Sequence, residues 1–289
     1  MNNTIRIEEI SLGINSPEAE LKTKIASILL ISESEILSYK IAKKAIDSRK
    51  KSNIHFVYCV DVVVSSIKDI SKLSSYHRVR LQEPFVYNIK KVKARNPRPL
   101  VVGFGPAGMF AALALSIAGL RPIVIERGQE IDKRVKSVDD FFKNTVLNSE
   151  SNIQFGEGGA GTFSDGKLYT LINDPRSAFI FNHLVEAGAP AEILTSATPH
   201  IGTDRLRVVV KNMRQRIIEL GAEIRFNTKL SELEIKDDKL VAVVLNDSEH
   251  LLVDTLVLAT GHSARDTYQM IYDNKLEMIA KSFAIGVRI

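Results

Sequence analysis

The spacing of hydrophobic and polar positions changes several times along this chain of 289 residues. Residues 5–12 alternate as a strand does, and residues 17–29 carry apolar side chains at helical spacing. Two further runs, 36–46 and 54–64, predict strands, and the second is rich in β-branched and aromatic side chains. This first third therefore predicts a small α+β N-terminal domain, which we bound at residues 1–96.

A charged segment with two prolines, residues 90–99, predicts a linker to a different pattern. Residues 100–102 and 122–125 are short apolar runs, and a glycine turn and a helix of small side chains, 107–118, lie between them. A strand, a helix and a strand in this order predict a βαβ unit with parallel strands.

A second helix and a group of strands follow. Residues 204–220 have apolar positions three and four apart, and Gly221 suits the end of that helix. Strands are predicted at 223–226, 229–236, 240–246, 250–252 and 255–259. We therefore predict an α/β fold, a Rossmann-like domain over residues 97–289 with a β-rich substrate region inserted at about residues 170–252.

Positive charge is concentrated near the start of the chain. Residues 1–98 hold 18 Lys and Arg against 10 Asp and Glu, whereas the whole chain holds 39 against 34. A solvated lysine-rich face is one interpretation, and an anionic partner such as RNA is the other. Few aromatic side chains accompany the basic ones, which disfavours RNA.

The composition argues against several classes of protein. The single cysteine, Cys59, cannot form an internal disulfide or the cysteine pair of a disulfide-reducing flavoenzyme. The histidines have no metal-site spacing, so we predict no metal site. Residues 1–9 lack the apolar core of a signal peptide, and the most apolar stretch, 109–120, is too short to cross a bilayer. We expect a cytoplasmic protein with no membrane partner.

The glycine turn is Gly103-Phe104-Gly105-Pro106-Ala107-Gly108, a GxGxxG motif between a predicted strand and a predicted helix. Gly103 permits the tight turn, Gly105 lets backbone approach a pyrophosphate, and Gly108 lets the helix pack on the sheet. Pro106 suits the first helical position, and the helix N-terminus offers free N–H groups to phosphate.

An acidic residue, Glu126, closes the next predicted strand. At this place in the motif its carboxylate can accept hydrogen bonds from both ribose hydroxyls of a dinucleotide, and its charge repels a 2′-phosphate. The motif alone leaves NAD and FAD open.

Longer segments carry a family resemblance. They are Glu126-Arg127-Gly128 with Arg134, residues 155–168 (FGEGGAGTFSDGKL), 200–206 (HIGTDRL), 259–266 (ATGHSARD) and 283–288 (FAIGVR). The chain resembles the FAD-dependent, or NAD(FAD)-utilising, dehydrogenases of unassigned substrate within the glutathione-reductase-like flavoprotein class. Members of that family continue beyond the point where this chain stops, so we expect the FAD-binding domain to be incomplete at its C-terminus.

The resemblance implies how a cofactor is held. The segment 158–167 is expected to run past the pyrophosphate and along the flavin ring, with Asp165 among its polar side chains, and the strand end at 259–261 to return to the cofactor. The implied cofactor-binding residues are Gly103, Gly105, Pro106, Ala107, Gly108, Glu126, Arg127, Arg134, Gly159, Ala160, Gly161, Thr162, Ser164, Lys167, Thr260 and Gly261. For His200, Arg205 and His262 surface or capping roles are favoured, and we assign no catalytic acid or base.

We therefore expect an FAD-binding oxidoreductase that acts on a small molecule, with FAD as cofactor and NAD(P)H as a candidate electron donor. The sequence does not identify the substrate or the oligomeric state. One alternative is a flavoprotein that binds or modifies RNA through the basic N-terminal domain, and another is an NAD-only Rossmann enzyme.

Overall fold

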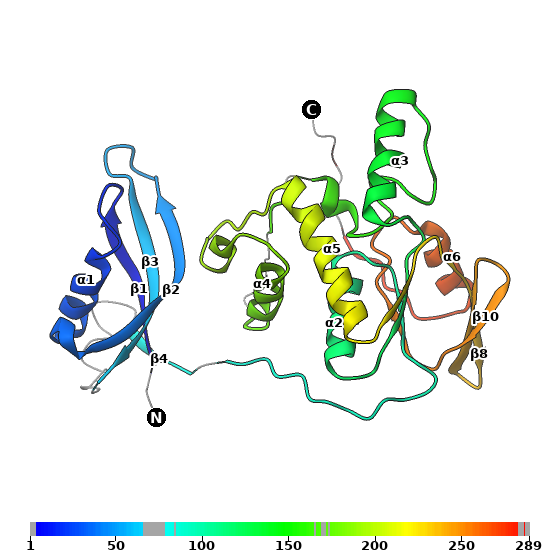
Figure 1. Ribbon diagram of the computed structural model, residues 1–289, viewed down its shortest axis with the longest axis horizontal. Helices are drawn as coiled ribbons and strands as arrows, with labels where there is room; N and C mark the ends of the chain where they lie inside the picture. The colour runs from blue at the N-terminus through cyan, green and yellow to red at the C-terminus, as the bar shows by residue number, and fades with distance from the viewer. Residues whose placement is uncertain are drawn as a thin grey trace. The chain divides into compact units, whose positions relative to one another are not determined.

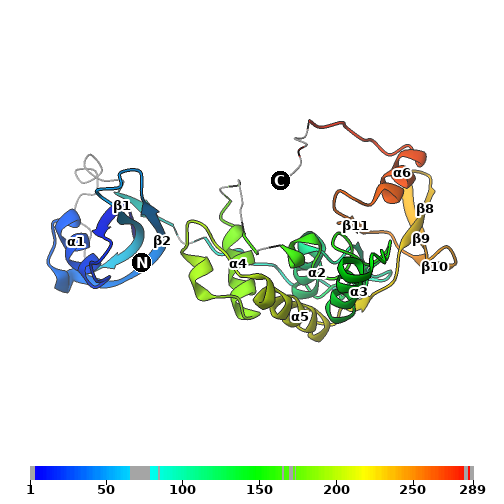
Figure 2. The same cartoon turned by 90° about the horizontal axis from the view of Figure 1, so that it is seen from above.

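The computed structural model describes residues 4–65, 79–83, 85–164, 166–168, 172, 174–282 and 286. The chain divides into two compact units, one within residues 1–88 and 165–209 and the other within 89–164 and 210–289. Each unit is taken by itself below (Figures 1 and 2).

The first unit contains an antiparallel sheet with one helix against it. The strands are β1 (Thr4–Gly13), β2 (Ile36–Asp47), β3 (His55–Val64) and β4 (Val79–Gln82), and their spatial order is β2-β3-β1-β4. The helix α1 (Glu20–Leu29) lies between β1 and β2 in the chain, and a short 3₁₀ turn, Glu33–Glu35, leads into β2. The strands expected at 5–12, 36–46 and 54–64 therefore form.

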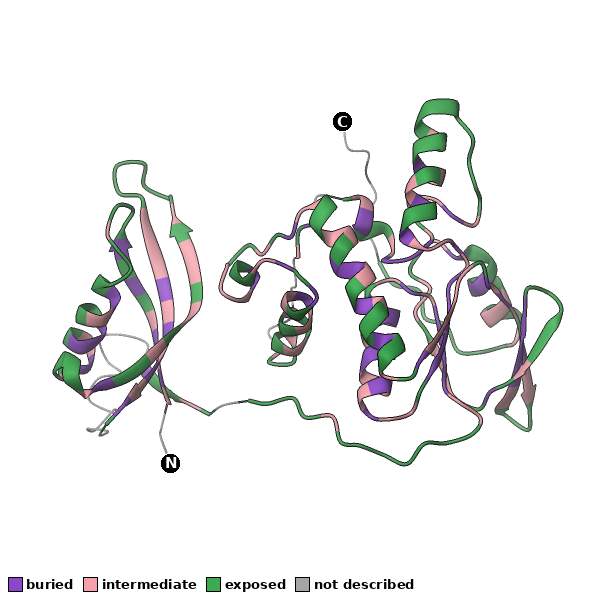
Figure 3. Cartoon of the chain, viewed as in Figure 1, coloured by how far each residue is buried: buried purple, intermediate pink, exposed green. Residues whose placement is uncertain are grey.

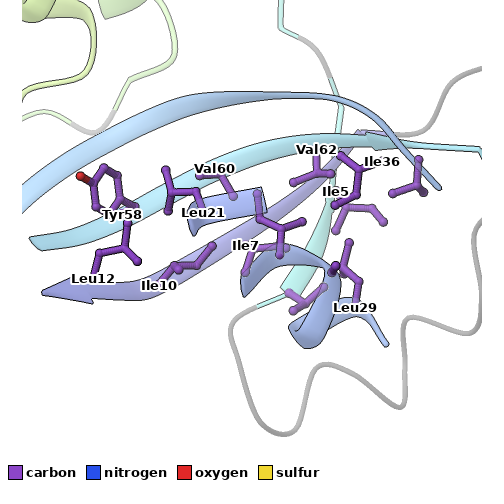
Figure 4. Close-up of a cluster of buried hydrophobic side chains, with 14 residues drawn as sticks. Ile5, Ile7, Ile10, Leu12, Leu21, Leu29, Ile36, Tyr58, Val60 and Val62 are labelled. Carbon is purple, nitrogen blue, oxygen red and sulfur yellow. The ribbon is translucent and has the colours of Figure 1, made fainter. Parts of the chain in front are cut away.

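Alternation along the strands builds the core of this sheet (Figure 4). Ile5 and Ile7 of β1 point to the same side as Val60 and Val62 of β3, and α1 covers them with Leu21 and other apolar residues. The pairing of β1 with β3 shifts between Ile7 and Ile10, at a bulge where Glu9 has a φ of 63°. The extra residue keeps Ile10 on the core side, so that one face of β1 stays apolar over its full length.

Leu21→Ala should lower the free energy of unfolding of this sheet and its helix by about 2–5 kcal/mol, the usual effect of the cavity that a truncated buried leucine leaves. Leu21 is fully buried in the cluster. Amide hydrogen exchange of β1 and β3 in the whole chain measures the effect. Ile46→Ala, at a side chain that is 60% exposed, is the matched control. Equal protection in the two variants would contradict the packing in Figure 4.

Beyond this sheet, the described part of the first unit includes the start of the helix α5 (Thr203–Glu219) and several short elements. They are α4 (Ser177–Glu186), a 3₁₀ turn (Ala191–Leu194) and a bridge between Lys167 and His200. The N–H of Leu168 donates to the carbonyl of Pro199, and that of Ile201 to the carbonyl of Gly166. Residues 166–168 thus run antiparallel to 199–201.

The second unit has a parallel sheet of β11 (Leu256–Leu258), β5 (Leu100–Val102), β6 (Ile123–Ile125) and β7 (Glu223–Arg225), in that spatial order. The helix α2 (Pro106–Ile117) joins β5 to β6, as the βαβ prediction required. Every residue of β5 and β6 is buried (Figure 3), as expected where a parallel sheet is covered on both faces. The fold is a mixed α/β fold built on a parallel sheet.

The predicted boundary of the insertion is wrong at residues 223–226. The prediction places them in the inserted region, but Glu223–Arg225 form β7, the strand next to β6 in the parallel sheet. The long helix α5 (Thr203–Glu219) ends just before β7, and Gly221, with a φ of 95°, makes the turn between them. A three-residue strand carries too little pattern to identify its partner, so only the pairing reveals its place.

Strands β8 (Leu230–Lys236), β9 (Lys239–Leu245) and β10 (Glu249–Leu252) form a separate antiparallel meander. Its apolar side chains, such as Leu233 and Val243, share a core with Val102 and Ile125 of the parallel sheet. The helix α6 (Arg265–Asp273) follows β11 and adds Met270 to this core. Figures 1 and 2 show the meander and α6 at one end of the unit.

Part of the predicted linker is attached to the second unit. The N–H of Val92 donates to the carbonyl of Ala118, at 2.9 Å. Arg95 forms an ion pair with Asp254, and Arg98 pairs with Glu223 at 2.9 Å. These residues belong to a segment that supplies five of the basic residues counted in 1–98 and no acidic one. Much of the excess positive charge therefore lies outside the N-terminal sheet, and two of these cations are already paired.

Candidate nucleotide-binding site

The glycine turn lies where β5 ends and α2 begins. Gly103 has a φ of 96°, and a Cβ built on it would lie 2.5 Å from the carbonyl oxygen of Ala259. The helix starts at Pro106 with an extended Gly105 before it, and the N–H of Met109 donates to the carbonyl of Gly105 at 2.9 Å. The N–H groups before Met109 have no intrahelical acceptor, so the first turn of α2 can bind an anion.

Gly108 and Gly105 have different steric surroundings. A Cβ on Gly108 would lie 1.9 Å from the carbonyl oxygen of Gly103, so the turn closes only with glycine at this place. A Cβ on Gly105 would lie 3.6 Å from the Cα of Gly159, which is an ordinary contact. Glycine at 108 thus allows α2 to lie close against the glycine turn. The fold does not require glycine at 105, so its role toward a pyrophosphate stays a prediction.

Glu126 follows β6 and is 5% exposed. Its Oε2 accepts a hydrogen bond from the N–H of Phe104 at 2.8 Å. Its Oε1 accepts from the N–H of Gly128 at 2.9 Å and from that of Gly156 at 3.0 Å. The carboxylate therefore ties together the glycine turn, the end of β6 and a loop that lies 30 residues further along the chain.

This loop, residues 152–159, crosses the glycine turn. The N–H of Gly158 donates to the carbonyl of Phe104 at 2.9 Å, and the N–H of Glu157 to that of Gln129 at 3.0 Å. Gly159, with a φ of 68°, lies against Gly105 and Pro106. The first part of the glycine-rich segment 155–168 is thus fixed to the turn by backbone hydrogen bonds.

A cleft of about 810 Å³ opens over the carboxyl ends of the parallel strands. Ligands of open α/β sheets bind at this edge. The predicted site residues that line the cleft are Gly103, Gly105, Pro106, Ala107, Glu126, Arg127, Gly159, Ala160, Thr260 and Gly261.

Other predicted residues lie elsewhere. Gly108 is buried at the turn, and Thr162 is fully buried, with a hydroxyl that has no hydrogen-bond partner among the residues that the structure describes. Gly161 is in a 3₁₀ turn, Ala160–Phe163, and Ser164 follows it; neither lines the cleft. Lys167 belongs to the first unit, and Asp165 and the residues around Gly286 lie outside the described residues.

Arg127 spans from the end of β6 to α6. Its Nη2 donates to both carboxylate oxygens of Asp266 at 2.9 Å, and its guanidinium lies 4.7 Å from the ring centre of Phe155. Burial raises the pKa of Asp266, but the hydrogen bond and charge of Arg127 outweigh it and hold the pKa below its ordinary value. The ion pair connects two walls of the cleft.

Arg134 was predicted to bind the cofactor, but its side chain is fully buried and does not line the cleft. Its guanidinium donates to backbone carbonyls of the loop 152–159. Burial lowers the pKa of Arg134 to about 10, although the charges of Glu126 and Glu157 act in the opposite direction. We therefore place it behind the wall of the cleft.

Several lining residues were missed from the sequence. Thr228 and Lys229 follow β7, and Tyr268 and Ile271 lie on α6. The ends of adjacent parallel strands meet at one edge of a sheet, so Thr228 would have been found if β7 had been placed beside β6. His262 also lines the cleft, and its Nδ1 is 2.8 Å from the hydroxyl of Ser263. His200 and Arg205 belong to the first unit.

Within the described ranges, no group of three or more His, Cys, Asp or Glu residues is arranged to hold a metal ion. In the same part of the chain, none of the helices combines the length and the apolar character that crossing a bilayer requires.

Comparisons with known proteins give sequence matches of two kinds, to a family model and to a curated protein. Residues 4–63 match the model of a family described as a domain of unknown function, DUF8436. A protein of Clostridium beijerinckii, described as uncharacterized, is 47% identical over 292 residues, which is 99% of this chain and 54% of that protein. The chain thus spans about half the length of this relative.

Solved structures give weaker similarities. THI4 of Thermovibrio ammonificans has a TM-score of 0.43 and 16% identity over 63% of each chain. The 3-ketosteroid-Δ4-(5α)-dehydrogenase of Rhodococcus jostii RHA1 has a TM-score of 0.38 and 17% identity, over 61% of this chain and 48% of the other. OTEMO, solved in complex with FAD and NADP, has a TM-score of 0.37 and 16% identity, over 58% and 26%.

Proposed function

We propose that the second unit binds FAD and that the protein is an FAD-dependent oxidoreductase acting on a small molecule. One observation carries the proposal. The N-terminal turn of α2 and the carboxylate of Glu126 open into the same cleft, at the carboxyl edge of a parallel β5–α2–β6 unit. This is the arrangement that binds the pyrophosphate and ribose of a dinucleotide.

The residues present fit the ADP half of FAD. The N–H of Ala107 in the first turn of α2 can donate to a pyrophosphate, and the volume of the cleft is in the range of cofactor sites, roughly 300–1,000 Å³. A carboxylate has about four acceptor positions, and Glu126 uses three of them on backbone N–H groups. Counting the hydrogen bonds of the described residues, one position, on Oε2, is left for a ribose hydroxyl. We therefore propose that Glu126 accepts a hydrogen bond from one ribose hydroxyl and not from both.

When bound, the flavin supplies the two-electron chemistry, and the protein orients it and sets its electrostatic surroundings. In this chain the glycine turn and Glu126 would hold the nucleotide end. Arg127, Phe155 and α6 would cover it and exclude water.

The alternatives have less support. The hypothesis of RNA binding depends on the excess positive charge of residues 1–98. Two of the basic residues counted there, Arg95 and Arg98, form ion pairs with carboxylates of the second unit. An NAD-only enzyme would also use the glycine turn and Glu126, so only ligand preference separates it from a flavoprotein.

Titration of the chain with FAD, FMN and NAD⁺ tests the proposal. We expect FAD to bind, and FMN to bind much more weakly because it has neither a pyrophosphate nor an adenosine ribose. Binding of NAD⁺ without FAD would favour the NAD-only enzyme. The whole Clostridium beijerinckii relative is the parallel sample, and failure of both proteins to bind FAD would refute the proposal.

A further inference from the structure

The loop 152–159 is organised around one buried cation. Arg134 is the fourth residue of α3 (Ile131–Asn144), and none of its surface is exposed. Its donors reach five carbonyl oxygens, those of Asn152 (2.9 Å), Ile153 (2.9 Å), Glu157 (2.6 Å), Gly159 (2.9 Å) and Gly156 (3.3 Å). The planar fork of a guanidinium, which carries five N–H donors, matches such a ring of acceptors.

No carboxylate among the described residues forms an ion pair with Arg134. The carboxylates of Glu126 and Glu157 act on it through their charges, and the ring centre of Phe163 lies 4.7 Å from its guanidinium carbon. A buried cation costs free energy unless its donors are satisfied, and here backbone carbonyls satisfy them. The buried position of Arg134 is therefore stable only in the conformation in which the loop carbonyls accept its hydrogen bonds.

The loop in turn holds the start of α3. The Oε2 of Glu157 accepts a hydrogen bond from the N–H of Ile131, the first residue of the helix, at 2.7 Å. Gly156 has a φ of 120°, and a Cβ on it would lie 2.4 Å from the Cδ of Arg134. The loop and the helix are therefore fitted to each other at this point, and glycine at 156 is required by the side chain behind it.

The backbone hydrogen bonds of the loop 152–159 link Arg134 to the residues around the cleft. The carbonyls of the loop point back to Arg134, while the N–H groups of Gly156 and Gly158 point forward, to Glu126 and to the carbonyl of Phe104. Gly159 then lies against the glycine turn. A change at Arg134 would release these forward contacts without touching a ligand.

We propose that Arg134 is the positioning residue of the nucleotide site: it holds residues 152–159 in the conformation that binds Glu126 and covers the glycine turn. This rests on the proposed function for the identity of the ligand, but not for the conformation of the loop. Arg134 acts through the backbone and does not contact the nucleotide.

The test compares Arg134→Met and Arg134→Lys with the wild type. Methionine keeps much of the volume but no donor, and lysine keeps the charge on a point donor that cannot reach the whole ring of carbonyls. Lys136→Met, at an exposed residue of the same helix, is the matched control. Amide hydrogen exchange of the ligand-free chain is measured first, and FAD affinity second.

We expect the amides of residues 156–159 to exchange about 10- to 100-fold faster in Arg134→Met than in the wild type, because the charged hydrogen bonds to the loop are lost. The increase in exchange rate should be smaller in Arg134→Lys. Strands β8 and β9 should keep their protection. FAD affinity should fall in the same order, and the control should match the wild type.

Unchanged exchange in the loop would overturn the proposal. So would an equal loss of protection throughout the second unit in both variants, because Arg134 would then be a general stability residue. A loosened loop with wild-type FAD affinity would also overturn it. If the wild type binds no FAD, the proposed function fails while the exchange result still decides the role of Arg134 in the loop.

Discussion

Replacing Gly108 with alanine is expected to destabilise the second unit by about 3 kcal/mol or more and to abolish nucleotide binding. The added Cβ would lie 1.9 Å from the carbonyl oxygen of Gly103, which is backbone and cannot rotate away. Either α2 or the glycine turn must shift, and forced overpacking of this kind costs 1–3 kcal/mol or occasionally more. Both shifts would move the N–H groups that face the cleft.

Two alanine substitutions in the same region are the controls. A Cβ on Gly105 would have an ordinary contact at 3.6 Å, and one on Gly161 would meet no atom of the described residues within 4 Å. Urea unfolding is measured for all three variants, so that both controls serve for stability, and FAD titration compares Gly108→Ala with the wild type. A Gly108→Ala variant as stable as Gly105→Ala would show that the turn and α2 are packed differently from this structure.

Glu126→Gln is expected to destabilise the second unit by about 2–4 kcal/mol, although the two side chains have nearly the same shape. Both oxygens of Glu126 accept hydrogen bonds from backbone N–H groups, and the residue is buried. Glutamine must place its NH₂ group against at least one of these donors. The least damaging orientation faces the N–H of Phe104 and leaves it without an acceptor.

The measurement is urea unfolding of the variant, with Glu232→Gln on the exposed side of β8 as the control. FAD affinity should fall as well, because the acceptor position left for the ribose is on the oxygen that becomes a donor. If Glu126→Gln is as stable as the control, the carboxylate is not held by the three backbone donors.

Local patterns were enough to predict the elements that surround the glycine turn. Two apolar runs, a helix of small side chains and a glycine motif lie within 30 residues, so sequence spacing alone identifies β5, α2 and β6. The partners of Glu126 could not be predicted in this way. Gly156 reaches it from a loop whose path depends on the buried Arg134, and no local pattern records such a contact.

The same limit explains the misplaced β7 and the residues missed at its end. Three residues of a strand, Glu223–Arg225, fit a meander or a parallel sheet equally well, and only long-range pairing with β6 decides between them. The linker shows a related effect. Its charge and prolines predict irregular backbone, but Arg98 finds its partners at residues 121, 122 and 223, which composition cannot show.

The absorption spectrum of the purified protein tests the central claim most directly. The chain and its Clostridium beijerinckii relative are expressed and purified without added cofactor, and any flavin released by heat is identified. The account predicts flavin absorption bands and release of FAD rather than FMN. Colourless protein that also takes up no FAD when it is added would contradict the assignment of the cleft to this cofactor.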